Sequence, residues 1–122
     1  MTVKKVNGIT YASLKDAEFV DTPDWGDDYK GRYWEIERSE DGRRSIVLFE
    51  QSGESDFEYP CSGVVVVRRG TLTCTFDDGQ VVELNEGDVA FFEKGVKGHF
   101  SLSEDFSDLA VFLSDDKPID LI

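Results

Sequence analysis

Histidine, cysteine and proline are scarce in this chain of 122 residues. It contains one histidine, two cysteines and three prolines. A metal centre built from several imidazoles and a scaffold held by many disulfides are therefore both excluded. Long apolar runs are missing as well, and none approaches the roughly 20 residues of a membrane-spanning helix.

Basic residues are also few, with 13 Lys and Arg against 26 Asp and Glu and a net charge of −13. This charge repels phosphate backbones and anionic lipid, so we expect no nucleic-acid partner and no membrane partner. The first residues carry two lysines and then polar side chains instead of the apolar core of a signal peptide. We therefore expect a cytoplasmic protein.

The two cysteines are expected to stay as free thiols in that compartment. Cys74 shares one strand face with Leu72 and Phe76, which predicts a buried thiol. Cys61 follows Pro60 in a turn-like setting, so we expect it to be the more exposed and reactive of the two.

Helix signals are weak, and the best of them, residues 13–19, predicts at most a short turn. Short runs rich in β-branched and aromatic residues dominate from residue 30 onward and are separated by glycine turns. This pattern is typical of a sandwich or barrel. We expect an N-terminal arm over 1–29, with a short strand or turn and an acidic loop, and a barrel over 30–122. The predicted strands are 32–38, 45–51, 56–60, 63–69, 71–76, 81–84, 88–92, 98–102 and 109–113.

The segments 70–84 and 87–98 have a distinctive glycine spacing, with Asp78-Gly79, Gly87-Asp88 and Gly95 between short strands. This spacing resembles the cupin superfamily, in particular the small (S)-ureidoglycine aminohydrolase-like cupins. The resemblance covers about residues 30–114. It implies an all-β fold, the RmlC-like double-stranded β-helix or jelly-roll barrel of cupins.

The first cupin motif commonly holds a metal ion through a His-x-His pair and a Glu. Aligned on Gly70, the resemblance puts Asp56 and Glu58 at the histidine positions and Gly63 at the glutamate position. Two carboxylates on one strand face could hold Mg²⁺ or Ca²⁺ weakly, but an exposed acidic strand on a chain of this charge is the favoured interpretation, because it needs no bound ion.

The second motif commonly supplies a further His and an Asn. Aligned on Gly87, it puts Gly98 and Leu102 at these positions, while His99 is one residue out of step and expected to point outward. Because glycine and leucine carry no donor atoms, we predict no bound metal and no cofactor. The missing ligands are expected to leave space inside the barrel.

The inward positions of the resembled motifs and the adjacent aromatic residues predict a site for a small organic ligand. No catalytic residue can be assigned from the sequence. The expected ligand-binding residues are Trp34, Asp56, Glu58, Tyr59, Phe100 and Leu102.

These observations favour a metal-lacking small cupin that binds a small metabolite, and whether it is an enzyme stays open. One alternative is a non-catalytic scaffold or interaction protein; the resemblance implies a homodimer, for which strands 46–49 and 109–113 offer apolar material. Another is a divergent ureidoglycine aminohydrolase-like hydrolase, whose activity in the resembled branch depends on a bound metal. A weak alkaline-earth enzyme with Glu93 or Tyr59 as general base is a further possibility.

Overall fold

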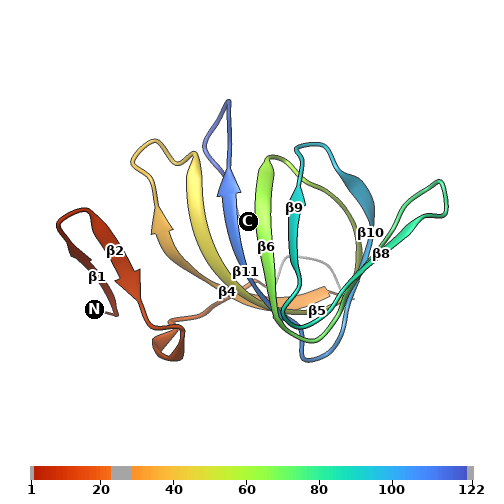
Figure 1. Ribbon diagram of the computed structural model, residues 1–122, viewed down its shortest axis with the longest axis horizontal. Helices are drawn as coiled ribbons and strands as arrows, with labels where there is room; N and C mark the ends of the chain where they lie inside the picture. Colours follow the sequence, from red (N-terminus) through yellow and green to blue (C-terminus); the bar gives the residue numbers. More distant parts are fainter. Residues whose placement is uncertain (1, 23–28, 121–122) are drawn as a thin grey trace.

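The computed structural model describes residues 2–22 and 29–120 (Figure 1). Strands make up almost all of its regular structure, as the sequence predicts. The elements are β1 (Val3–Val6), β2 (Ile9–Ala12), the 3₁₀ helix η1 (Leu14–Asp16), β3 (Val20–Asp21), β4 (Tyr29–Arg38), β5 (Arg44–Glu58), β6 (Ser62–Arg69), β7 (Leu72–Thr75), β8 (Val81–Leu84), β9 (Val89–Phe92), β10 (Lys97–Leu102) and β11 (Ser107–Leu113).

One antiparallel sheet forms the barrel, with the strand order β8-β7-β10-β5-β11-β6-β9 and with β4 and β3 added along the first part of β5. The β1–β2 hairpin is a separate two-stranded sheet, which projects to one side of the barrel in Figure 1. No helix in the described ranges is long and apolar enough to cross a membrane.

Strand β5 is longer than the sequence suggested. We expected Gly53 to end one strand before a second began at Asp56, but a single strand continues to Glu58. Gly53 has φ 109°, a conformation that side chains with a Cβ rarely adopt, and it lets the strand bend without ending. The first part of β5 pairs with β4 and β11, and the part after the bend pairs with β10.

The glycine turns are where the sequence put them. Gly87 and Gly95 lie in turns with φ of 87° and 90°, and Gly42 has φ 74° in the turn between β4 and β5. The predicted hairpin of the two strands around Gly42 is confirmed. The short turn predicted after residue 13 is also present as η1, with Ser13 as its N-cap.

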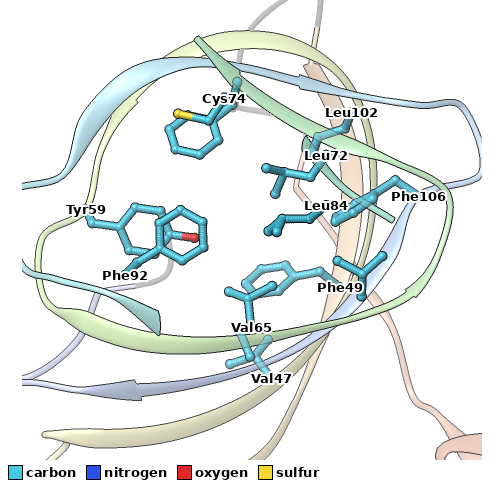
Figure 2. Packing of buried hydrophobic residues seen from close by; sticks show 13 residues of the cluster. Val47, Phe49, Tyr59, Val65, Leu72, Cys74, Leu84, Phe92, Leu102 and Phe106 are labelled. Carbon is cyan, nitrogen blue, oxygen red and sulfur yellow. The ribbon is translucent and has the colours of Figure 1, made fainter. Parts of the chain in front are cut away.

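The core lies inside the barrel, where apolar side chains from opposite strands meet (Figure 2). Tyr59 and Phe92 stack with ring centroids 4.5 Å apart. Cys74 is 1% exposed, as expected, but Cys61 is also buried, so its predicted exposure is wrong. The segment after β11 stays beside the turn between β4 and β5, where the Ile119 amide donates to the Gly42 carbonyl at 2.8 Å, and Ile119 and Cys61 line the same cavity.

Candidate functional site: a cavity inside the barrel

A cavity of about 250 Å³ lies within the barrel and is walled mainly by aromatic and aliphatic side chains. It receives residues from both halves of β5, from β7, β10 and β11, and from the C-terminal segment. The described lining includes no Lys, Arg or His. Its aromatic members are Tyr29, Phe49, Phe57, Tyr59, Phe100 and Phe112.

Strand alternation in the second half of β5 decides which side chains reach this cavity. Ser55 and Phe57 line it, so Glu54, Asp56 and Glu58 project to the outer surface. The expected inward orientation of Asp56 and Glu58 is therefore wrong. The alignment on Gly70 was one residue out of step, and the paired inward positions at this end of the strand belong to Phe57 and Tyr59.

On the outer surface, Asp56 takes part in a cluster with the single histidine. His99 Nδ1 lies 2.9 Å from Asp56 Oδ1, and Nε2 lies 3.0 Å from Glu54 Oε1. The hydrogen bonds with Glu54 and Asp56 raise the pKa of His99. The outward position predicted for His99 is confirmed, since its pairing partner Asp56 on β5 is also exposed.

The other predicted site residues divide into two groups. Tyr59, Phe100 and Leu102 all line the cavity, and their role in ligand binding stays a prediction. Trp34 is 6% exposed but pairs across the sheet with Leu48, on the face of β4 opposite to the cavity-facing Tyr29. Its expected place in the cavity wall is wrong, because β4 presents its odd-numbered residues inward at this point.

The positions that resemble metal-ligand positions do not fit a metal ion. A Cβ at Gly98 would lie 2.7 Å from Cys74 Sγ, and one at Gly63 would lie 3.2 Å from Phe112 Cδ1. The space expected at these two glycines is thus filled by neighbouring side chains, and the cavity lies elsewhere in the barrel. Among the residues described, no group of three His, Cys, Asp or Glu side chains could hold a metal ion.

Asp108 is a cavity residue with a charged side chain that was not predicted from the sequence. It is 5% exposed and faces inward from β11, on the same side as the lining residues Ala110 and Phe112. Its Oδ1 is buried and has no hydrogen-bond partner among the described residues. Burial away from water raises the pKa of Asp108 to about 7.

A sequence signal for Asp108 did exist. The predicted strand began at Leu109, two residues after the start of β11, so the acid lay outside every predicted strand. Extending the apolar alternation of β11 back by one step puts Asp108 on the face of Ala110 and Phe112. A carboxyl group on the apolar face of a strand is unusual enough to indicate a site.

Two tyrosines lie close to this carboxyl group. Burial raises the pKa of both Tyr29 and Tyr59, and the charge of Asp108 adds to the effect in each case. Both phenols therefore stay protonated at neutral pH. Figure 2 shows the Tyr59 ring reaching into the barrel interior beside Phe92.

Comparisons with known proteins support the fold. EutQ from Clostridium difficile matches at a TM-score of 0.78 with 21% identity, over 93% of each chain. A putative ethanolamine utilization protein from Salmonella typhimurium matches at 0.74 with 15% identity, over 91% of this chain and 93% of that one. An RmlC-like cupin from Shewanella frigidimarina matches at 0.64 with 15% identity, over 95% and 96% of the two chains. The comparison with curated protein sequences gave no match.

The sequence itself matches the profile of the EutQ-like cupin domain over residues 38–107, which is more than half of the chain. The expected cupin, RmlC-like fold is confirmed. The family matched is EutQ-like, and the finer assignment to the ureidoglycine aminohydrolase-like branch stays a prediction. The chain belongs to the EutQ-like cupin domain family.

Proposed function

We propose that this cupin binds a small organic molecule, and not a metal ion, inside its barrel. The observation that carries the proposal is the cavity itself, about 250 Å³ of space walled by aromatic and aliphatic side chains. Ligand sites in proteins are commonly apolar cavities with a few polar groups, and those for drug-sized molecules begin near 300 Å³. The ligand is accordingly a metabolite smaller than a typical drug.

Three of the predicted ligand-binding residues support the same proposal. Tyr59, Phe100 and Leu102 lie on the wall, and Phe57 adds a further ring, with 6.0 Å between the centroids of Phe57 and Phe100. Flat rings on several sides of a cavity favour an occupant that is itself flat or largely apolar.

Filling the cavity tests the proposal. A panel of small neutral aromatic compounds, including indole and benzyl alcohol, would be screened by ligand-observed NMR, and Kd values would follow from amide shift titrations. In Ser55→Phe a ring enters the cavity wall, whereas in the matched control Ser52→Phe it projects from the outer face of the same strand. We expect Ser55→Phe to weaken binding at least fivefold and Ser52→Phe to leave it unchanged. Failure of the whole panel and of its cationic analogue benzylamine to bind wild type, or equal binding by both variants, contradicts the proposal.

We also propose a homodimer, although not through the strands suggested by the sequence. Strands 46–49 and 109–113 are paired along both edges within the barrel, so they offer no free edge for exchange. The edge strand β9 instead exposes Val89 by 65% and Phe91 by 60% on the outer face. On a chain of net charge −13, a surface with exposed apolar side chains such as these is where two copies can meet with the least repulsion.

Light scattering after size exclusion tests the dimer. We expect wild type to elute as a dimer and Phe91→Glu as a monomer. Val81→Glu changes an equally exposed apolar residue on β8 and should leave the dimer intact. A monomeric wild type contradicts this proposal and leaves ligand binding in the barrel unaffected.

The hydrolase alternative is less well supported. An activity like that of the ureidoglycine aminohydrolase branch would need a bound metal, and the described residues hold no suitable group of donors. The weak alkaline-earth site is not proposed again either, because Asp56 pairs with His99 outside the barrel.

A further inference from the structure

We propose that the cavity selects small organic cations, and that an ammonium group of the ligand hydrogen-bonds to the Asp108 carboxylate. This inference rests on the proposed ligand-binding function of the barrel and names the chemical class of the ligand. It starts from the polar atoms that the cavity leaves without partners.

The first step is the position of Asp108. Its neighbours across the sheet are Phe49 on β5 and Val67 on β6, so the carboxyl group lies deep in the barrel wall and not at its rim. Both neighbours are buried. Water cannot solvate a carboxylate well at such a place, and an unpaired one costs free energy that nothing in the described fold offsets.

The second step is the absence of a counter-charge within the described part of the chain. The nearest arginines along β6 are engaged elsewhere, because Arg69 donates to Glu50 at 2.8 Å and Arg68 donates to the Ser107 hydroxyl at 3.1 Å. The described cavity lining has no basic side chain at all. A cation that reaches Asp108 must therefore come from a ligand.

The third step concerns the other titratable groups that face this carboxyl. They are Tyr29 from β4, Tyr59 at the end of β5, Cys61 beyond it and Asp120 from the C-terminal segment, all in the cavity lining. Burial keeps the tyrosines and Cys61 neutral near pH 7, because it raises the pKa of each. The neutral phenols can accept a hydrogen bond from a cationic ligand, and the two acids attract its charge, whereas the lining holds no basic side chain that would attract an anion.

The fourth step is the match between the walls and the body of such a ligand. Phe57, Phe100 and Phe112 present rings to the cavity, and aromatic faces attract ammonium groups as well as apolar carbon. The hydroxyl of Tyr59 and the amide of Gln51 make no side-chain hydrogen bond among the described residues, so they can accept or donate a further bond. A charge-assisted hydrogen bond to Asp108 is stronger than a neutral one, so the cavity should bind an ammonium ligand more tightly than the corresponding alcohol.

Benzylamine and benzyl alcohol are the probes that test this inference. They share a ring and differ in the group that would meet Asp108, and benzylamine is protonated between pH 6 and pH 8. Their Kd values would be measured by amide shift titration at pH 8 on wild type, on Asp108→Asn and on the surface control Asp77→Asn. We expect wild type and the control to prefer benzylamine by at least about tenfold and Asp108→Asn to show no preference.

The pH dependence gives a second readout that needs no variant. Asp108 has a pKa of about 7, so the ionised fraction rises from about one tenth at pH 6 to about nine tenths at pH 8. The affinity of wild type for benzylamine should rise roughly tenfold over this range, and calorimetry in buffers of different ionisation enthalpy should detect proton release at pH 7. If Asp108→Asn does not fold, these two measurements decide the question.

The possible results separate the inference from the function on which it rests. Equal affinity for the two probes in wild type overturns the cation selection, while the barrel remains a ligand site. Benzylamine affinity that does not change with pH overturns it as well. Failure of both probes and of the neutral panel overturns the ligand-binding function together with the inference.

Discussion

Glu50 and Asp108 lie on neighbouring strands, one residue out of step, and the sheet treats their carboxyl groups in opposite ways. Glu50 points outward and accepts hydrogen bonds from Arg32 at 2.6 and 2.8 Å and from Arg69 at 2.8 Å. Partial burial would raise the pKa of Glu50, but these two arginines together lower it. Asp108 points inward, has no such partner, and its pKa is raised to about 7 by burial.

The comparison shows that the face from which an acidic side chain projects, and not the number of basic residues nearby, decides whether its carboxylate is paired. The pairing partner of Glu50 on β11 is Ser107, immediately before Asp108, and Arg69 on the neighbouring strand β6 pairs with the same Ser107. Side chains on opposite faces of a sheet cannot reach one another. A stable fold pairs the acid it can pair, and the unpaired acid is the one to examine for function.

The largest expected effect concerns Asp108. A raised folded-state pKa means that the folded protein holds a proton which the unfolded chain gives up near pH 4. Stability from this group is therefore fully present below about pH 4 and is lost as pH rises to about 7. Three pH units at about 1.36 kcal/mol each amount to about 4 kcal/mol. We expect Asp108→Asn to gain about this much relative to wild type between pH 4 and pH 8, measured as urea unfolding free energies.

The comparison between variant and wild type is essential in this experiment, since carboxyl groups as a class titrate at acid pH and only the difference isolates Asp108. A free-energy difference that stays constant with pH would mean that Asp108 is solvated or paired in solution. In that case the carboxyl groups of Asp108 and Glu50 would not differ in the way that the two faces of the sheet suggest.

Packing offers a second contrast between inside and outside. Gly98 faces inward, and an added Cβ would lie 2.7 Å from Cys74 Sγ; Gly95 lies in an open turn with φ 90° and nothing within 4 Å of its added Cβ. We expect Gly98→Ala to destabilise by about 1–3 kcal/mol through overpacking. Gly95→Val should cost more than about 1 kcal/mol, through backbone strain alone.

The double variant Gly98→Ala with Cys74→Ala separates these two causes. Removing the sulfur should recover most of the loss at Gly98, as followed by thermal unfolding, and the same Cys74→Ala change should not help Gly95→Val. Equal rescue of both would show that the clash at Gly98 is not the cause.

The sequence was sufficient for most strands of the barrel, the glycine turns and the cupin fold, because short periodic segments and glycine spacing are local features. It was insufficient for the face of each side chain near the cavity. An error of one residue in aligning β5 reverses every orientation, which is why Asp56 and Glu58 were expected inside. The residues around Gly53 have the composition of a turn, so nothing in the sequence indicated that β5 continues through the bend. Cys61 is buried at a cavity that Ile119, distant in sequence, also lines, and its local sequence carries no signal of this.

Glu50 should show the opposite sign to Asp108. Its folded-state pKa is lowered, so its stabilising effect is present above the ordinary glutamate pKa and is lost as pH falls through the folded value. We expect Glu50→Gln to destabilise by about 1 kcal/mol at pH 7 and by less at pH 3, in urea unfolding. Arg43→Gln, which removes a pair between two exposed side chains, is the control and should have little effect. If the Glu50→Gln variant is as stable as wild type at pH 7, the ion pairs of Glu50 contribute no more to stability than ordinary surface ion pairs do.

The smallest expected effect belongs to His99, on the outer surface of β10. Hydrogen bonds with Glu54 and Asp56 raise its folded-state pKa above the ordinary value near 6.5. The stabilisation is thus fully present below about pH 6.5 and is lost as pH rises through the higher folded value. His99→Gln should lower the urea midpoint slightly at pH 5.5 and not at pH 8.5, and added salt should reduce the difference because the cluster is exposed. Ionisation of Asp108 also lowers the stability of the protein as pH rises through this range. Both forms, with and without His99→Gln, should therefore carry Asp108→Asn. A midpoint difference that is the same at both pH values would show that the acidic neighbours do not stabilise the protonated form of His99.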